Sequence, residues 1–215
     1  MRPVLPILLL LAASAFARAD EWWAWSSLEL WRQEHNSASL FLGNRLDADD
    51  GAYVQIISPR FKRAVLPWLD AGLGLSLLSI ENTTTGDRFT QFRPELELNP
   101  RFLLTDHLQL EWRNRLEYRQ NEGQSFTLHR SRHRLQLGLT LPDPIGPLTR
   151  VFISNEWLSN LDRMQLGENR LVPLGLTFKL SDRSQLDVFY MVLSARAQAQ
   201  WQHESVIGTY WRVKF

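Results

Sequence analysis

The sequence of 215 residues contains no cysteine, and its longest uninterrupted apolar run ends before residue 18. Without thiols there is no disulfide scaffold, thiolate metal site, iron–sulfur cluster or cysteine nucleophile. A membrane helix needs about 20 apolar residues, so the rest of the chain is not a helical membrane protein. Lys and Arg number 24 against 23 Asp and Glu, and phosphate loops and paired dinucleotide glycines are missing. We therefore expect no nucleic-acid partner, no cofactor and no metal.

The N-terminal segment has the features of a secretory signal peptide. Met1 and Arg2 form a short positive start, Val4 to Ala15 is apolar, and Ala17-Arg18-Ala19 offers small residues at the two positions that a signal peptidase reads. We expect cleavage before Asp20, which makes residues 1–19 a signal peptide and residues 20–215 a single exported domain. No cysteine follows the apolar segment, which excludes a lipid-anchored lipoprotein.

The exported part of the chain alternates apolar and polar residues. Gln91 to Arg101 places Phe92, Leu96 and Leu98 on one parity and charged residues on the other, and Leu108 to Arg119 repeats the pattern. In a helix these charges would wind around every face, whereas in a strand they form one polar wall. The same argument predicts strands at Leu69–Leu77, Ser125–Leu141, Arg170–Leu180, Gln185–Leu193, Ser205–Phe215 and, on weaker patterns, Trp22–Arg32, Ser37–Leu46, Ala52–Lys62 and Leu148–Glu156.

Alternation of apolar and polar residues alone fits a soluble or a membrane barrel. The two differ only in whether the apolar face points into the barrel or out of it. Strands of about ten residues, export, and alternating short and long connecting segments favour the membrane. Aromatic residues near strand ends are typical of interfacial girdles: Trp22, Trp23, Trp25, Trp31, Phe41, Phe61, Trp68, Phe102, Phe126, Trp157 and Trp201. We expect an all-β, antiparallel transmembrane β-barrel in a bacterial outer membrane, surrounded by outer-membrane lipid. The final strand, which ends at Phe215, resembles the signal read by the barrel-insertion machinery.

Eleven strands are indicated, but a bacterial single-chain barrel with both termini in the periplasm has an even number. We therefore predict twelve strands, or ten if Trp22–Arg32 is not a full crossing. Pro59, Pro94, Pro100 and Pro173 fall inside predicted strands. Because a closed barrel has no edge on which a missing donor is harmless, bulges or strand ends must absorb them.

The order of several segments resembles a known bacterial outer-membrane family. The residues that carry the resemblance are the aromatic opening Trp22-Trp23-Ala24-Trp25, Phe92-Arg93-Pro94-Glu95, Trp112 to Arg119, Arg130 to Leu135, Ser154-Asn155-Glu156, Glu168-Asn169-Arg170, Leu186 to Met191 and Val206-Ile207-Gly208. On these the chain is similar to the family catalogued as domain of unknown function 2490. The resemblance implies export and a barrel, and it implies no activity because the family's function is unassigned.

The polar parity of the central strands is rich in arginine. The candidate lumen residues are Arg93, Glu95, Glu97, Arg101, Glu111, Arg113, Arg115, Glu117, Arg119, Arg130, Arg132 and Arg134, eight arginines against four glutamates. One interpretation is an Arg–Glu network that fills a narrow lumen and is purely structural. The other keeps the pairing and uses unpaired arginines to bind or conduct small anionic solutes. In that case we expect selectivity to be set by Arg113, Arg115, Arg130, Arg132 and Arg134.

Two alternatives stay open beside a structural barrel or a narrow anion channel. The arginine rows are similar to those of monomeric porins for acidic oligosaccharides. A lipid hydrolase would need a serine beside a histidine, and Ser154 is the candidate serine. His129 and His133 flank Ser131, but all three lie on the outward parity. Candidate residues at the outer rim are Asn155, Glu156, Asn169 and Arg170, with Glu156 and Arg170 predicted to form a salt bridge there. We expect no enzymatic activity.

Overall fold

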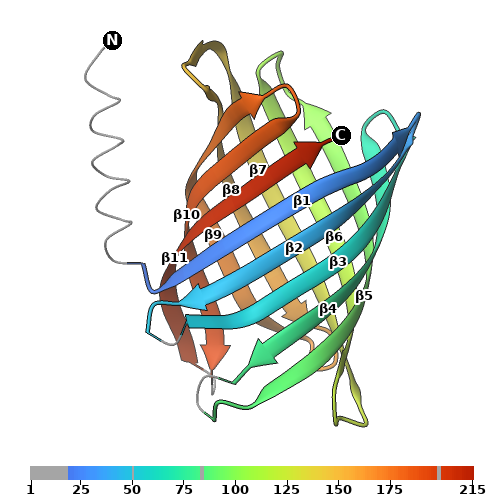
Figure 1. The fold of residues 1–215 in the computed structure, drawn as a ribbon, viewed down its shortest axis with the longest axis vertical. Helices are drawn as coiled ribbons and strands as arrows, with labels where there is room; N and C mark the ends of the chain where they lie inside the picture. Colours follow the sequence, from blue (N-terminus) through green and yellow to red (C-terminus); the bar gives the residue numbers. More distant parts are fainter. Residues whose placement is uncertain (1–18, 50, 83–84, 198–199) are drawn as a thin grey trace.

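The computed structural model describes residues 19–49, 51–82, 85–197 and 200–215. These residues form eleven β-strands, drawn in Figure 1. In chain order they are β1 (Glu21–Gln33), β2 (Asn36–Asp47), β3 (Gly51–Leu66), β4 (Leu69–Glu81), β5 (Arg88–Leu103), β6 (Leu108–Asn121), β7 (Thr127–Ile145), β8 (Leu148–Asn160), β9 (Gln165–Ser181), β10 (Ser184–Ala197) and β11 (Gln200–Lys214). No helix in the described residues is long and apolar enough to cross a membrane.

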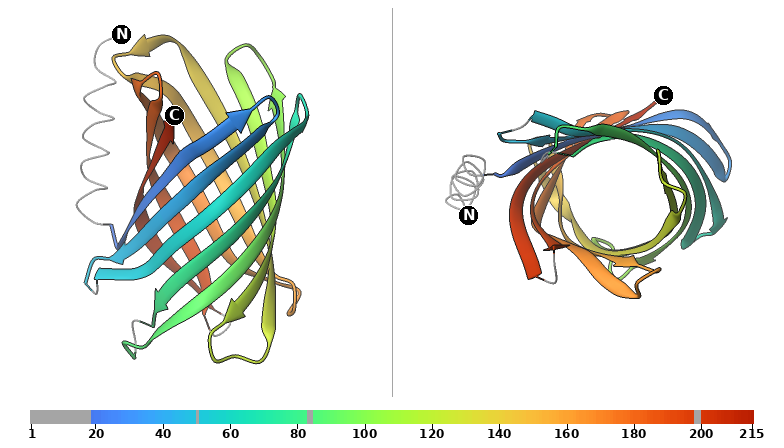
Figure 2. Two further views of the ribbon diagram at one scale, coloured as in Figure 1. Left: turned by 45° about the vertical axis from the view of Figure 1, so that its right-hand side comes forward. Right: turned by 90° about the horizontal axis from the view of Figure 1, so that it is seen from below.

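The strands close into a barrel in which each pairs with its sequence neighbour, and Figure 2 shows the ring in cross-section. All of these neighbours are antiparallel, but closure is made by β1 and β11, which pair in parallel from Glu21↔Val206 to Glu29↔Lys214. The predicted count of twelve (or ten) and the fully antiparallel sheet are therefore wrong: the barrel is mixed and has eleven described strands. An even number is needed only when the first and last strands are antiparallel, and parallel closure removes that requirement.

The two ends of the barrel have different connections. At one end, which we call the short-turn rim, neighbouring strands are joined by segments 34–35, 67–68, 104–107, 146–147 and 182–183. At the other, the loop rim, they are joined by 48–50, 82–87, 122–126, 161–164 and 198–199. The asymmetry is smaller than the sequence predicts, because β8, β9 and β10 continue through residues that were expected to be loop. With an odd number of strands, Asp20 and Phe215 lie at opposite rims (Figure 1).

Proline is accommodated by local irregularities, as predicted. Pro173 lies where β9 shifts register against both neighbours, between Phe152 and Ser154 on β8 and between Tyr190 and Val192 on β10. Pro94 pairs with Leu75 on β4, while the pairing of β5 with β6 is interrupted there. At a bulge or an interrupted pair, no buried carbonyl on the neighbouring strand needs the backbone N–H that proline lacks.

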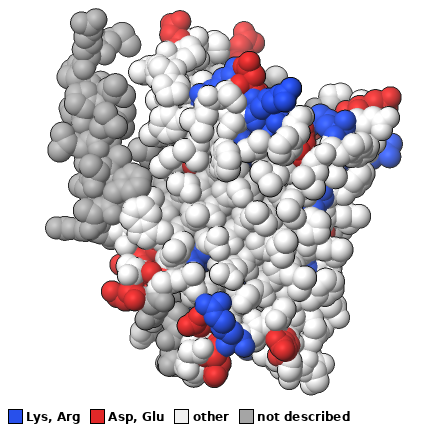
Figure 3. Space-filling model, in the orientation of Figure 1, with Lys and Arg blue, Asp and Glu red and all other residues white. Residues whose placement is uncertain are grey.

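The alternation is inverted relative to a soluble barrel. On β5 the inward residues Gln91, Arg93 and Glu95 are buried, whereas the outward Phe92 and Leu96 are 44% and 47% exposed. Leu73, Leu75 and Leu77 on β4 are likewise exposed. In Figure 3 the charged residues gather towards the two rims, with a broad band of other residues between them. The outer wall is therefore apolar and the lumen polar. The predicted signal peptide, residues 1–19, lies outside the described residues except for Ala19.

Candidate functional site in the lumen

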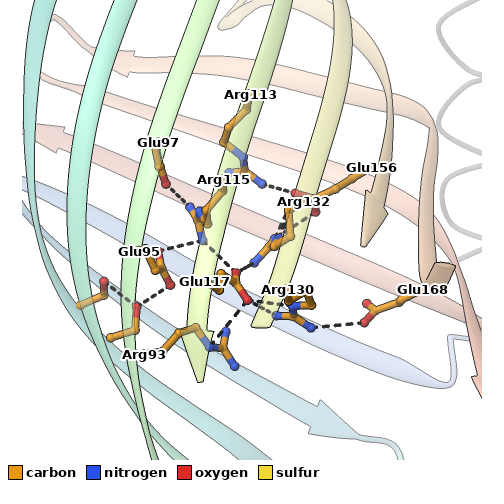
Figure 4. Close-up of polar contacts among 12 residues, drawn as sticks. Arg93, Glu95, Glu97, Arg113, Arg115, Glu117, Arg130, Arg132, Glu156 and Glu168 are labelled. Atoms are coloured by element: carbon orange, nitrogen blue, oxygen red, sulfur yellow. Dashed lines mark hydrogen bonds and ion pairs between the residues drawn. The ribbon is translucent and has the colours of Figure 1, made fainter. Parts of the chain in front are cut away.

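Alternation on β5 to β8 turns a row of charged side chains into the lumen, and we call this row the charged wall. Figure 4 shows its ion pairs, which run from β5 across β6 and β7. Its members are Arg93, Glu95, Glu97, Arg113, Arg115, Glu117, Arg130, Arg132, Arg134 and Glu156. The structure thus brings together most of the residues that the sequence predicts for the lumen.

Two carboxylates hold most of the charged wall together. Glu117 lies within ion-pair distance of Arg130 (2.6 Å), Arg132 (2.9 Å), Arg93 (3.8 Å) and Arg115 (3.8 Å). A carboxylate shared among several buried arginines satisfies each only in part. The wall therefore keeps a positive excess after its pairs are counted.

Glu156 is shared in the same way. It pairs with Arg113 (2.6 Å), Arg132 (3.0 Å) and Arg170 (3.7 Å). Both Glu156 and Arg170 are buried, with 4% and 3% of their surface exposed. The predicted outer-rim salt bridge is thus an inward pair within the network, because the even parity of Glu156 on β8 turns it to the lumen.

Arg115 ties the charged wall to β3 through shared carboxylates. Arg115 contacts Glu95 (3.0 Å) and Glu97, and Arg60 on β3 contacts the same two carboxylates at 2.8 Å each. Arg60 was not among the predicted lumen residues, although its even parity on β3 matches that of Ser58 and Lys62. The inward network therefore extends further round the barrel than the sequence analysis indicates.

Arg132 and Arg134, two of the arginines expected to set selectivity, have different surroundings. Arg132 is 7% exposed and bonded to Glu117 and Glu156. Among the described residues Arg134 has no carboxylate within 4 Å, and neither has Arg119; the Nε atoms of both are buried without a partner. Arg132 is therefore a structural member of the network, whereas Arg134 has a guanidinium group free to bind an anion.

Two further predicted lumen residues lie nearer the short-turn rim. Arg101 pairs with Asp70 at 3.0 Å and is 43% exposed at its side chain, and Glu111 pairs with Arg150 at 2.7 Å. Each is a local pair between strands rather than part of the shared carboxylates. They contribute charge to the mouth of the lumen.

Opposite the charged wall the lumen is aromatic and apolar, which the sequence analysis did not predict. We call Trp23, Trp25, Phe41, Phe189 and Tyr210 the aromatic wall. Trp25 has ring centroids 5.3 Å from Trp23, 5.7 Å from Phe189 and 6.3 Å from both Phe41 and Tyr210. Trp23, Trp25 and Phe41 were expected in an outer girdle, but their parity on β1 and β2 turns them inward.

Glycine makes room for the aromatic wall. Gly208 on β11 pairs with Phe189, and a Cβ at position 208 would overlap the Phe189 ring. Gly175 has the same relation to Phe152 on β8. Each ring lies over the glycine of the neighbouring strand. The ring fills the space that a side chain at that position would take. Gly208, in the last strand of the chain, thus has a packing role.

The two walls meet in a layer without access to water, which we call the closing layer. It is formed by inward side chains that are each at most 7% exposed: Trp23, Ser58, Ser76, Glu95, Glu117, Arg132, Glu156, Arg170, Met191 and Val206. Trp23 donates from Nε1 to Glu21, and the guanidinium groups of Arg45 and Arg170 lie 4.0 and 4.8 Å from its ring centroid. Cation–π contact in a dry site adds up to about 2 kcal/mol. At this level of the barrel, buried side chains therefore fill much of the lumen.

On the other side of this layer the lumen contains a cavity of about 800 Å³, which we call the vestibule. Turn residues Glu34 and His35 and strand-end residues Arg32 and Lys214 line its mouth, so it opens at the short-turn rim. Thirteen of its lining residues are Arg or Lys and six are Asp or Glu. A low-dielectric chamber with such a lining concentrates anions. In the part of the chain that the structure describes, no cluster of three or more His, Asp or Glu could hold a metal.

Two other predicted site residues lie on the outer wall. Asn155 and Asn169 face outward and bond to each other at 2.8 Å. Ser154, the candidate nucleophile, is 8% exposed and has even parity on β8, so it faces the lumen. A serine–histidine contact that the sequence analysis missed lies elsewhere: Ser194 Oγ and His203 Nδ1 are 2.8 Å apart on β10 and β11.

Comparisons with known proteins name no activity for this chain. The family described as "Protein of unknown function (DUF2490)" matches residues 20–204. A search of curated proteins finds no match. Among solved structures, an anion-selective porin from Comamonas acidovorans is similar at 13% identity and a TM-score of 0.43, over 85% of this chain and 55% of that one. The chain therefore spans about half the length of that porin.

Proposed function

The chain belongs to the family described as Protein of unknown function (DUF2490), and we propose that it is an outer-membrane β-barrel whose lumen accepts small anionic solutes. Solutes enter the vestibule from the short-turn rim, and passage through the barrel requires the closing layer to move. The observation that carries this proposal is the excess of basic side chains around the vestibule.

The outer wall supports a membrane location. Large apolar side chains are 40–60% exposed on most strands, for example Leu73 on β4, Leu116 on β6 and Ile153 on β8. An apolar band of this extent is unfavourable in water and is expected against lipid. Strands of 12 to 19 residues exceed the roughly 10 that a tilted crossing needs.

The ion pairing of the arginines favours a lumen that binds an anionic solute over one filled by a purely structural network. A closed network would pair each guanidinium with its own carboxylate, whereas here Glu117 and Glu156 are shared and Arg134 has no carboxylate partner among the described residues. Planar guanidinium groups suit carboxylates and phosphates. An acidic oligosaccharide is a larger solute of the same class, and its passage needs a wider opening than the closing layer leaves.

The absence of cysteine allows a direct test. A Ser39→Cys variant places one thiol in the vestibule, and Ser125→Cys places one in the exposed segment 122–126. We expect the ratio of modification rates by an anionic and a cationic thiosulfonate to be about tenfold higher at position 39 than at position 125, because the basic lining concentrates anions. Equal ratios at the two positions would refute an anion-accepting lumen.

A lipid hydrolase is the second candidate, favoured by the Ser194–His203 contact on the outer wall. Ser194 is paired in register with Asn169, which bonds to Asn155, so four polar side chains lie near the loop rim. Histidine beside serine is the arrangement that activates a nucleophile. In this hypothesis Ser194→Ala abolishes fatty-acid release from phospholipid vesicles while Ser125→Ala retains it. Wild-type protein that releases no fatty acid would eliminate this candidate.

A further inference from the structure

Two arginines of the vestibule lie side by side, but only one of them has a carboxylate partner among the described residues. Arg113 on β6 and Arg134 on β7 are partners in register, and both line the cavity. Arg113 bonds to Glu156 at 2.6 Å, whereas Arg134 has no carboxylate within 4 Å among the residues described. Adjacent like charges in a partly dry site repel. An anion bound between them would relieve that repulsion.

The nearby carboxylates are already engaged. Glu156 also serves Arg132 and Arg170, and Glu111 bonds to Arg150. The Nε atoms of both Arg113 and Arg134 are buried without an acceptor. A buried donor without an acceptor carries an unfavourable free energy, which a ligand oxygen would remove. The pair is thus the place in the charged wall where an incoming carboxylate gains most.

The same vestibule presents flat aromatic faces. Trp25, Phe41 and Tyr210 line it, with 6.2 to 6.3 Å between the ring centroids of neighbouring pairs. A volume of about 800 Å³ lies within the range of small-molecule sites. The guanidinium groups of Arg60 and Arg212 lie 5.1 Å from the ring centroids of Phe41 and Tyr210, so a solute ring would stack beside these cations. A simple inorganic anion would use the arginines and gain nothing from the aromatic side chains.

We propose that the vestibule binds a carboxylate carried on a six-membered ring, with the carboxylate between Arg113 and Arg134 and the ring towards Trp25, Phe41 and Tyr210. Two kinds of solute share this chemistry, namely an aromatic acid and a uronic acid, because both an aromatic ring and the C–H face of a sugar stack on aromatic side chains. The inference rests on the proposed function, since it requires a lumen that accepts anions.

Calorimetric titration of the full chain, folded in detergent, with acetate, benzoate and glucuronate tests the inference. We expect one of the ring acids to bind about three- to tenfold more tightly than acetate, which is the size of an aromatic contact. Arg134→Gln should weaken all three by about tenfold or more, and Arg134→Lys by less, because a charge-assisted hydrogen bond is lost or replaced. The control is Arg119→Gln, which removes another arginine without a carboxylate partner, one that does not line the cavity.

A second variant separates the ring from the charge. Phe41→Leu should reduce the advantage of the ring acid while acetate binding is unchanged. Tighter binding of benzoate than of glucuronate would identify an aromatic acid, and the reverse order a uronic acid. Equal binding of all three acids, or full affinity in Arg134→Gln, would overturn the inference even if the Ser39→Cys modification still prefers the anionic reagent. Loss of that preference would instead refute the proposed function itself.

Discussion

The charged wall and the aromatic wall fill the same lumen by different means. In the charged wall, buried arginines share carboxylates, so each paired guanidinium depends on a carboxylate one or two strands away. In the aromatic wall, rings pack on one another and on glycines of adjacent strands. The first kind of packing leaves unsatisfied charge that can attract an anion, whereas the second excludes water and offers a ligand only apolar ring faces. A barrel lined only by the charged wall would be an open charged pore. A barrel lined only by the aromatic wall would be closed by packed rings.

The largest effect on the charged wall is expected at Glu156. Glu156→Gln leaves Arg113, Arg132 and Arg170 without their shared charge, and breaking a buried ion pair in this way destabilises by about 4 kcal/mol. The free energy of unfolding in urea, measured in detergent, is the readout. Asp106→Asn, in an exposed turn, is the control. A loss no larger than that of the control would mean that the network does not stabilise the barrel.

The corresponding change in the aromatic wall is Trp23→Ala. It removes the ring that contacts Trp25 and the guanidinium groups of Arg45 and Arg170, and we expect a loss of about 3 kcal/mol in unfolding free energy. Trp22→Ala changes the neighbouring outward ring, which is 41% exposed. If the two variants lose the same free energy, the closing layer is not a packed structure.

A smaller effect is expected where glycine faces an aromatic ring. Gly208→Ala places a Cβ against the Phe189 ring and should cost about 1–3 kcal/mol, because the ring must move. Gly167→Ala is a matched strand control, since its nearest neighbouring atom is 3.8 Å from the added carbon. Thermal unfolding of both variants compares them, and equal stability would mean that Phe189 does not need the glycine.

The smallest effect lies outside both walls, in segment 161–164. The backbone N–H and the imidazole of His129 bond to the Asp162 carboxylate and hold its pKa below the usual value. A lowered folded pKa means that this contact stabilises the loop at neutral pH and is lost as pH falls below about 4 through the folded pKa. The protection factor for hydrogen exchange at Leu161, whose N–H bonds to His129, should therefore fall in acid. Asp162→Asn should have a low protection factor at both pH values; a wild-type protection factor would contradict this.

The eleven strands and the charged wall were predictable because alternation is a property of each strand alone. Arg113 and Arg115 share a parity with Glu117, and that parity decides which way they face. The closure was not predictable in this way, since the even-number rule presumes an antiparallel first and last strand. The aromatic wall was predictable in part: Trp23 and Trp25 share the parity of Glu21, which indicates the lumen, but proximity to the strand end led to a girdle interpretation.

Other features depend on register between strands, which one sequence does not contain. That Gly208 faces Phe189 follows from which residues are opposite each other. Arg134 is opposite Glu156 and Arg132 is opposite Leu158, yet the Glu156 side chain binds Arg132, so the ion pairs also depend on side-chain conformation. The pairing of Ser194 with His203 is likewise a matter of register. The residue types therefore predict the chemistry of the lumen, whereas only the folded barrel shows which charged groups are paired and which are not.

The most direct test of the account is the single-channel current of wild-type protein and of Trp23→Ala in a planar bilayer with a salt gradient, after heat-modifiable migration has shown both to be folded. The account predicts little or no steady current from the wild type, because the closing layer seals the lumen. It predicts stable anion-selective steps from Trp23→Ala, because the vestibule then connects to the loop rim. Stable steps of equal size from both proteins, or cation-selective steps from the variant, would contradict it.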